Sequence, residues 1–191
     1  MATIRPARQS DMKAVEHICR MTAGNLARTN DIIGEATAKT YSTYYIRECT
    51  DTCFVLADDT DTPVGYILCE PDYKRYRKVF RKKDVPAIYS IYKKDGVSAW
   101  FLPVPFSFFG RKYPAHLHID ILPEYQNKGY GGLLVNELLT ELHKRQVKGV
   151  MLTADAENDG AIRFYKRLGF ETVVCSKRIN AIIMAKNIFG K

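Results

Sequence analysis

Gln126-Asn127-Lys128-Gly129-Tyr130-Gly131-Gly132 is the stretch that decides the fold of this chain of 191 residues. It lies between a strand-like run at residues 117–121 and a run with helical periodicity at residues 133–145. The glycines let the turn approach a phosphate closely, and the first N–H groups of the following helix have no partner inside that helix. The stretch therefore predicts an anion site built by a strand, a glycine turn and a helix N-terminus.

The glycine spacing excludes two common phosphate loops. Leu134 stands where the dinucleotide-binding fingerprint needs its third glycine. A P-loop ends in Gly-Lys followed by Ser or Thr, and this turn does not. The pattern that remains is Gln-x-x-Gly-x-Gly, directly after a strand that ends at Leu122-Pro123.

This pattern resembles the pyrophosphate-binding motif of the GNAT superfamily of N-acetyltransferases, whose loop holds the pyrophosphate of coenzyme A. A second block, residues 158–170, ends in Phe164-Tyr165-Lys166-Arg167-Leu168-Gly169-Phe170 and is similar to another recurrent segment of that family. The two blocks stand in the order that the family has, and the resemblance covers nearly the whole chain outside residues 71–112. It implies acetyl-CoA as the cofactor.

The hydrophobic periodicity of the rest of the chain predicts a mixed α/β (α+β) fold that matches the GNAT order. Strands are predicted at 3–5, 53–57, 64–69, 117–121, 149–154, 170–175 and 181–185, and helices at 11–23, 30–49, 133–146 and 158–168. We expect a single domain over residues 1–191, with a central, mostly antiparallel, twisted mixed sheet of about six or seven strands flanked by helices. Residues 71–112 form an aromatic-rich insertion between the third and fourth strands.

Composition limits the class of protein. A chain of 191 residues with 46% hydrophobic content is long enough for one buried core and short for two. No apolar run approaches the roughly 18 residues of a membrane span, and the first residues lack the apolar centre of a signal peptide. The five cysteines have no metal-like Cys-x-x-Cys spacing. These features predict a cytoplasmic protein with reduced thiols and no membrane partner.

Much of the net charge of +8 lies at residues 73–83, where basic residues alternate with Tyr73, Tyr76 and Phe80. Such a run could pair phosphates with stacking platforms, as in nucleic-acid binding. The other interpretation is an amphipathic helix, because aromatic residues three and four positions apart share one face. We favour the helix, since no recognisable nucleic-acid-binding fold surrounds the run, and nucleic acid is not an expected partner.

The resemblance also implies functional roles for named positions. The residues with implied cofactor contacts are Ile119, Asp120, Ile121, Gln126, Asn127, Lys128, Gly129, Tyr130, Gly131, Gly132, Asn158 and Tyr165. Tyr165 occupies the position of the tyrosine that in many GNATs protonates the leaving thiolate. Each role has a structural alternative: Tyr165 could pack against the sheet, Asn158 could only cap its helix, and Lys128 could be a surface lysine. For Arg163, Lys166 and Arg167 we favour simple exposure on the helix over contact with the 3′-phosphate.

His116, His118 and Asp120 alternate with apolar residues and therefore share one face of a strand. We predict no metal site, because three candidates on one strand cannot alone close a tetrahedral shell. Two interpretations remain: a polar lining of the acceptor cleft and a satisfied structural network. In the first, His118 or Asp120 is the catalytic base that deprotonates the acceptor amine.

The aromatic residues at 86–113 also allow two interpretations. They form an apolar flap over the sheet, or they form an aromatic wall for a sugar, an aromatic amine or a peptide. The insertion also leaves room for a homodimer interface.

A narrower resemblance involves residues 113–123, a run similar to the corresponding strand of the acetyltransferase-like domains of eukaryotic O-GlcNAcases and their stand-alone bacterial relatives. Some members of that group have lost the cofactor loop, which this sequence keeps. The sequence thus predicts an N-acetyltransferase that moves acetyl directly to a primary amine of a small molecule or peptide, because no cysteine in either motif offers an acyl carrier. The alternative is a catalytically silent pseudo-acetyltransferase that binds coenzyme A or the acceptor.

Overall fold

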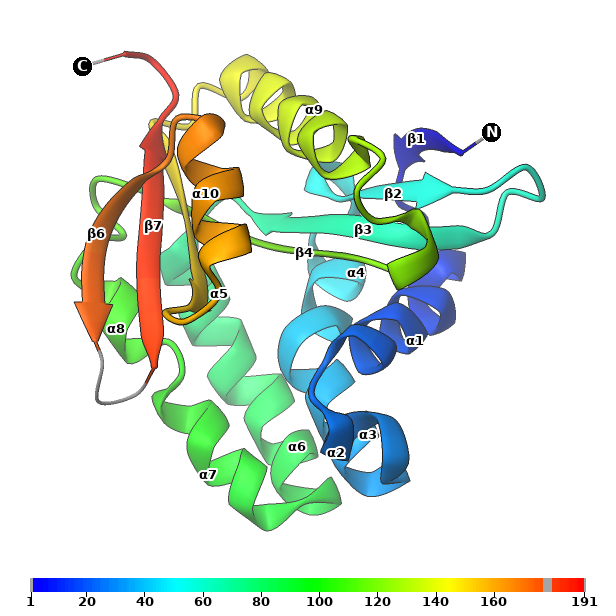
Figure 1. Ribbon diagram of the computed structural model, residues 1–191. Coiled ribbons are helices and arrows are strands. Elements are labelled where there is room, and N and C mark those ends of the chain that lie inside the picture. Colours follow the sequence, from blue (N-terminus) through cyan, green and yellow to red (C-terminus); the bar gives the residue numbers. More distant parts are fainter. Residues whose placement is uncertain (1, 177–179, 191) are drawn as a thin grey trace.

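The computed structural model describes residues 2–176 and 180–190, and its centre is a twisted seven-stranded sheet (Figure 1). The strands are β1 Thr3–Pro6, β2 Phe54–Ala57, β3 Pro63–Glu70, β4 Ala115–Ile121, β5 Gly149–Asp155, β6 Glu171–Ser176 and β7 Ala181–Asn187. They lie in the order β1-β2-β3-β4-β5-β7-β6, and β4 and β5 are the one parallel pair in this sheet. The predicted mixed, mostly antiparallel sheet is confirmed.

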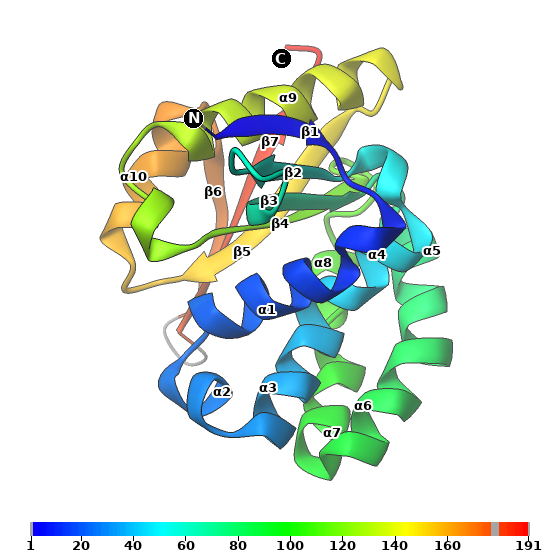
Figure 2. The ribbon, with the colours of Figure 1, turned by 90° about the vertical axis from the view of Figure 1, so that its right-hand side faces the viewer.

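Helices cover both faces of the sheet, as the side view in Figure 2 shows. One face carries α9 (Tyr130–Lys144) and α10 (Asp159–Arg167). The other face carries α1 (Met12–Thr22), α3 (Asp31–Ala38), α4 (Tyr44–Glu48) and the helices of the insertion, and α2 (Asn25–Thr29) links α1 to α3. Because side chains alternate along a strand, the sheet divides the apolar interior into two cores.

The predicted helix at 30–49 has an irregular middle. Between α3 and α4 the chain makes a π-helical turn at Lys39–Thr43. Thr40 Oγ1 donates to Ala36 O at 2.7 Å and Ser42 Oγ donates to Ala38 O at 2.8 Å. Such hydroxyl contacts compete with regular backbone bonds and commonly accompany distorted helices. The turn carries Tyr41 toward β4, where its ring stacks on His118.

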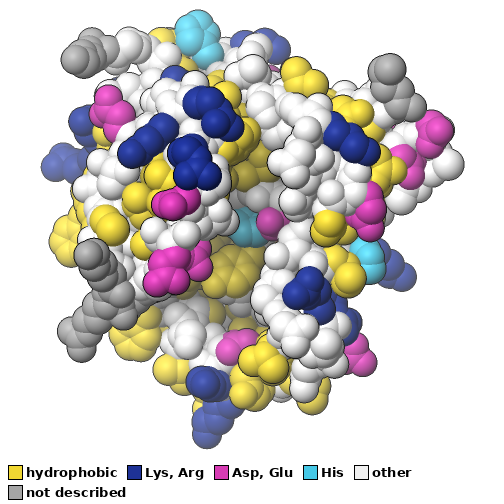
Figure 3. All heavy atoms as spheres, in the orientation of Figure 1, with side chains coloured by type: hydrophobic (Ala, Val, Ile, Leu, Met, Phe, Trp, Pro, Cys, Tyr) yellow, Lys and Arg dark blue, Asp and Glu magenta, His cyan; other side chains and the backbone are white. Residues whose placement is uncertain are grey.

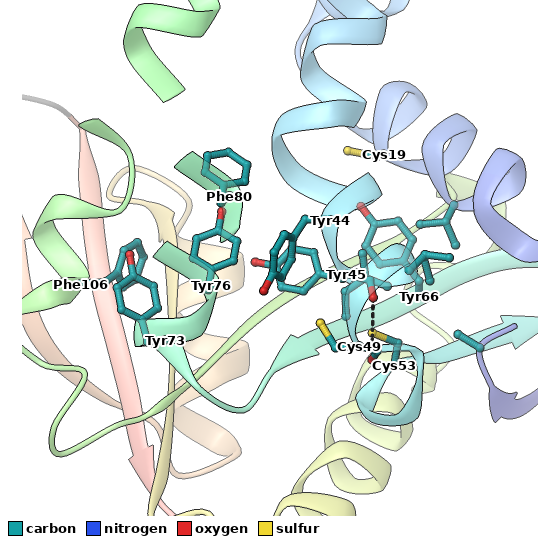
Figure 4. Packing of buried hydrophobic residues seen from close by; sticks show 14 of the residues in the cluster. Cys19, Tyr44, Tyr45, Cys49, Cys53, Tyr66, Tyr73, Tyr76, Phe80 and Phe106 are labelled. Atoms are coloured by element: carbon teal, nitrogen blue, oxygen red, sulfur yellow. Dashed lines mark hydrogen bonds between the residues drawn. The ribbon is translucent and has the colours of Figure 1, made fainter. Parts of the chain in front are cut away.

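The insertion is helical. It comprises α5 (Tyr73–Val79), a π-helical turn (Phe80–Asp84), α6 (Val85–Ile91), α7 (Lys93–Phe101) and α8 (Val104–Ser107). Tyr73, Tyr76 and Phe80 are at most 2% exposed and point into the core beside Tyr44 and Tyr45 (Figure 4). The run of basic and aromatic residues is therefore an amphipathic helix with a packed aromatic face, as we favoured.

The parallel pair β4 and β5 diverges soon after it begins. The two strands pair at Ala115↔Val150 and His116↔Met151, after which β4 stays with β3 and β5 stays with β7. The sheet therefore opens between β4 and β5 on the side toward the glycine turn. None of the described helices combines the length and apolarity needed to cross a membrane.

Candidate active site

A cleft of about 720 Å³ lies where the two strands diverge. One wall is the end of β4 at Ile119, Asp120 and Ile121, and the opposite wall is α10. The glycine turn closes one end with Gln126, Asn127, Gly129, Gly131 and Gly132. From Leu117 onward, the β5-facing edge of β4 has no strand partner among the described residues, so its backbone groups are available to a ligand.

The turn has the backbone conformation of an anion site. Gly129 has φ +83° and caps α9, and Asn127 has φ +58°. The Gln126 side chain ties the turn to the strand, since Nε2 donates to Ile121 O at 2.7 Å. Together these features point the first N–H groups of α9 into an open space, as phosphate binding requires.

Two predicted cofactor residues do not line the cleft. The Lys128 ammonium lies over the Tyr125 ring, 5.4 Å from its centroid, and Tyr130, the first residue of α9, packs against the core. The left-handed residues Asn127 and Gly129 on either side of Lys128 change the chain direction there, which local sequence reasoning did not resolve.

Two cations that we expected to be exposed on the helix are exposed and also line the cleft. Arg163 and Arg167 lie one turn apart on α10 and face it. Basic side chains gather over α10 on the face shown in Figure 3. Arg163 and Arg167 are four residues apart in the same block as Asn158 and Tyr165. This spacing could have indicated that both arginines face the cleft.

Tyr165 and Asn158 line the cleft on the α10 side. Asn158 also caps the helix, because its Oδ1 accepts from Ala161 N at 2.9 Å. Tyr165 packs edge-on against Phe164 and Phe170 and is 8% exposed. Burial, and to a lesser degree the nearby Asp120 carboxylate, raises the pKa of Tyr165. Its hydroxyl therefore stays protonated at neutral pH, the state that a proton donor needs.

A second cavity, of about 250 Å³, lies on the other face of β4. Its lining consists of Cys19, Thr22, Ala23, Thr37, Tyr41, His118 and Asp120. Asp120 lines both this cavity and the cleft, so the two meet at that carboxylate. Seen from the side that Figure 3 shows, the molecular surface has a hollow near its middle, and histidine and acidic side chains lie inside this hollow.

At this junction His118 and Asp120 form a hydrogen-bonded group with Tyr66 of β3. Tyr66 Oη donates to Asp120 Oδ2 at 2.6 Å and lies 3.2 Å from His118 Nδ1, while His118 Nδ1 and Asp120 Oδ2 are 3.5 Å apart. The Tyr41 ring stacks on His118 with centroids 5.6 Å apart. Tyr41 and Tyr66 were not predicted, since nothing in the local sequence pairs them with β4.

His116 differs from its two neighbours on the same strand face. It packs against Tyr73, Tyr76 and Phe106, and its Nδ1 lies 2.8 Å from Tyr45 Oη. Burial, with a smaller contribution from His118, lowers the pKa of His116 to about 3. His116 is therefore a half-buried, neutral residue packed among aromatic rings, because the insertion covers this end of β4. His116 thus fits the interpretation of a satisfied structural network, whereas His118 and Asp120 line an open cavity.

No group of three His, Cys, Asp or Glu side chains able to hold a metal occurs in residues 2–176 and 180–190. Within the same ranges the cysteines are unpaired: Cys19, Cys49, Cys53 and Cys69 are buried and Cys175 is exposed.

Residues 25–170 match the model of the acetyltransferase (GNAT) family, which is most of the chain. The chain belongs to the GNAT family. The predicted fold, family and enzyme class are confirmed. The narrower comparison with the O-GlcNAcase domains stays a prediction.

Among solved structures, this GNAT chain is similar to SsHAT, with 29% identity over 99% of both chains and a TM-score of 0.88. It also shares its fold with the PaiA N-acetyltransferase of Thermoplasma acidophilum, solved in complex with coenzyme A, at 16% identity over 98% of this chain and 99% of that one, with a TM-score of 0.63.

Two curated GNAT relatives match over shorter stretches. The [ribosomal protein bS18]-alanine N-acetyltransferase of Escherichia coli is 37% identical over 76 residues, which are 36% of this chain and 51% of the relative. An uncharacterized N-acetyltransferase of Methanocaldococcus jannaschii is 43% identical over 58 residues, 30% of this chain and 26% of the relative. The matches thus span about a quarter to a half of the relatives' length.

Proposed function

We propose that this GNAT enzyme transfers an acetyl group from acetyl-CoA directly to a primary amine held in the second cavity. The observation that supports this most strongly is the junction at Asp120, where a cleft suited to coenzyme A meets a separate cavity lined by a histidine and a carboxylate. Two substrates bound from opposite sides of β4 would meet there, as direct transfer requires.

The residues of the cleft fit coenzyme A. The open N-terminus of α9 suits a pyrophosphate, Arg163 and Arg167 suit further phosphate charge, and the unpaired edge of β4 suits an extended amide-bearing arm. When bound, acetyl-CoA supplies an activated acetyl group and a thiol leaving group. The backbone N–H groups along this edge of β4 are candidates to stabilise the charge that develops on the acetyl oxygen.

His118 is proposed as the base for the amine. An alkylamine with a pKa of about 10.4 is almost wholly protonated at pH 7, so it needs help to become a nucleophile. Tyr66 donates to Asp120, which leaves the Tyr66 oxygen to accept from a proton on His118 Nδ1. We assign the hydrogens in this way. His118 Nε2 is then unprotonated and can accept the amine proton, while Asp120 orients the ring.

Tyr165 is proposed as the acid on the opposite side of the junction. Its raised pKa keeps the hydroxyl protonated, and the hydroxyl belongs to the wall of the cofactor cleft. It would give its proton to the departing thiolate. His118 and Tyr165 thus have complementary duties, and Asp120 lies between them.

Calorimetric titration with acetyl-CoA tests the cofactor site. We expect wild-type protein to bind and Gly129→Glu to lose binding, because the new carboxylate would stand at the anion site. Gly190→Glu is the matched control: both glycines have positive φ and open space at the Cβ position, so the two variants carry the same backbone strain and the same charge.

Binding by the wild type and the control, with loss in Gly129→Glu, would justify a screen of amines that follows thiol release. A folded wild-type protein that fails to bind acetyl-CoA would overturn the proposal and favour a catalytically silent binding module.

A further inference from the structure

The second cavity continues into a third, of about 190 Å³, between the α3 to α4 region and the insertion. Thr37 and Tyr41 line both. The third cavity adds Thr40, Asp95, Ser98, Ala99 and Leu102. We call the two cavities together the acceptor groove. It runs from Asp120 on β4, past the Tyr41 ring, to Asp95 in the first turn of α7.

Four hydroxyl groups of the acceptor groove already donate within the protein and can only accept a hydrogen bond from a ligand. Thr22, Thr37 and Thr40 each donate to a backbone carbonyl of their own helix, at 2.8, 2.8 and 2.7 Å. Ser98 donates to Lys94 O at 3.2 Å in the same way. The hydrogens of these four hydroxyls are thereby used, and lone pairs remain for a ligand. Such a lining suits a ligand rich in N–H donors.

The charge of the acceptor groove also favours a ligand that carries N–H donors, because the groove is acidic. Its charged lining consists of Asp95 and Asp120, and no Lys or Arg appears in the described lining, although the chain carries a net charge of +8. Asp95 makes no ion pair with any described residue. Asp95 and Tyr41 line the same third cavity. The groove is therefore negative at both ends, whereas the cofactor cleft presents arginines.

Between the two carboxylates the lining is apolar. Cys19 and Ala23 lie toward Asp120, and Ala99 and Leu102 lie toward Asp95, with the Tyr41 ring shared. Such a surface can bury methylene groups without leaving a polar atom that lacks a hydrogen-bond partner. An alkyl chain with a cationic group at each end would match the order of charged, apolar and charged lining.

We propose that the acceptor is a linear α,ω-diamine of the polyamine class, with one amine at Asp120 and His118 and the distal ammonium at Asp95. This inference rests on the proposed acetyl transfer. The proximal nitrogen forms the new N–C bond as the C–S bond of the thioester breaks. One proton of the bound ammonium passes through His118 to solvent, and the neutral nitrogen then attacks the acetyl carbon. Its second proton passes to His118 while the thiolate takes a proton from Tyr165, and return of that second proton from His118 to Tyr165 restores both groups. Atoms and charge thus balance with the release of one proton, while the distal ammonium keeps its proton.

Steady-state acetylation assays with matched amines test the proposal. The probes are diaminobutane and diaminohexane, the monoamines n-butylamine and n-hexylamine, and 6-aminohexanoate, whose distal group is a carboxylate. We expect kcat/KM for the better diamine to exceed that of its monoamine by at least about tenfold, the effect of roughly one well-placed ion pair. Aminohexanoate should be the poorest acceptor, since its carboxylate would meet Asp95.

Variants at the distal end sharpen the test. Asp95→Asn should lower the ratio of diamine to monoamine kcat/KM by about tenfold, and Asp95→Lys should reverse the order of diaminohexane and aminohexanoate. Glu35→Gln is the matched control, because it removes an exposed carboxylate from α3 outside the groove. That control should leave the ratio unchanged. Calorimetric binding of acetyl-CoA shows that each variant is folded.

The outcomes distinguish failure of the diamine proposal from failure of the proposed acetyl transfer. Equal kcat/KM values of the wild-type protein for diamines and their matched monoamines would overturn the diamine proposal and leave acetyl transfer standing. An Asp95→Lys variant that keeps the wild-type order of acceptors would do the same. Absence of thiol release with every amine, although acetyl-CoA binds, would overturn both.

Discussion

Asp120 is the residue on which the proposed chemistry depends most. It lines the cofactor cleft and the acceptor groove, accepts a hydrogen bond from Tyr66 and contributes to the raised pKa of Tyr165. Its neighbour two positions earlier, His118, shares the Tyr66 hydroxyl. A base and an acid thus lie on the two sides of one carboxylate, and their contributions should be separable by kinetics.

We predict different pH behaviour for loss of the acid and loss of the base. Tyr165→Phe should lower kcat by about a hundredfold at every pH, the usual size of a general-acid contribution, with little change in the KM for acetyl-CoA. The double variant His118→Ala with Asp120→Asn should lower kcat/KM for the amine comparably at pH 7. Its deficit should shrink toward pH 10, where the amine deprotonates unaided. The measurement is a pH–rate profile for each protein.

A Tyr165→Phe enzyme with wild-type kcat would reduce this tyrosine to a packing residue of α10. If the double variant kept the wild-type kcat/KM at pH 7, His118 and Asp120 would have a structural role only and no role as the catalytic base.

At the scale of elements, the glycine-rich turn combines two different requirements. Gly129 is needed for backbone conformation, since its φ is +83°. Gly131 is needed for space, because a Cβ there would lie 3.2 Å from Phe164 Cζ. The close approach of α9 to α10 therefore depends on this one missing methyl group. Gly132, one residue later, has open space at its Cβ position.

Adjacent alanine substitutions should consequently have opposite effects on stability. We expect Gly131→Ala to reduce the free energy of unfolding by about 1–3 kcal/mol, as overpacking does. Gly132→Ala, at a helical position with free space, should increase it by about 0.5–1 kcal/mol. Urea unfolding measures both. Phe164→Leu should recover part of the Gly131→Ala loss in a double-mutant cycle, and additive effects would contradict the proposed contact.

At the scale of the whole molecule, the helical insertion divides the polar face of β4. Its aromatic residues cover His116 and leave His118 and Asp120 open, so one strand face becomes core at one end and site at the other. The insertion also supplies Asp95 to the acceptor groove. The aromatic wall interpretation does not apply there, because the residues that α7 contributes to the groove are Asp95, Ser98 and Ala99. Trp100 and Phe101 are exposed elsewhere.

The packing of His116 among aromatic rings should appear in the pH dependence of stability. Its folded-state pKa of about 3 is below the ordinary 6.5, so between these values the unfolded chain binds the extra proton. The free energy of unfolding should therefore fall as pH decreases from about 6.5 toward 3. Above pH 6.5 His116 should add nothing to the slope of stability against pH. His116→Gln should make the slope shallower, whatever its effect on absolute stability.

Chemical unfolding at a series of pH values between 4 and 8 measures this slope. His17→Gln, at an exposed position on α1, is the control and should retain the wild-type slope. An unchanged slope in His116→Gln would mean that this histidine titrates alike in both states.

The sequence by itself determined the order of the elements and the two motifs, because these depend on local periodicity and turn chemistry. The glycine turn after β4 and the stop of α10 at Gly169, with φ +82°, are properties of neighbouring residues. Tyr165 and Asn158 were predictable for the same reason. The packed stripe of Tyr73, Tyr76 and Phe80 followed from helical spacing, together with the lack of a recognisable nucleic-acid-binding fold around it.

Tertiary structure decided which side chains meet. The divergence of β4 from β5, the turning of Lys128 out of the cleft and of Arg167 into it, and the junction at Asp120 all depend on contacts between distant segments. The acceptor groove joins Tyr41, Asp95 and Asp120 from three separate parts of the chain. Their spacing carries no periodic signal, because packing of the insertion against α3 and α4 brings them together.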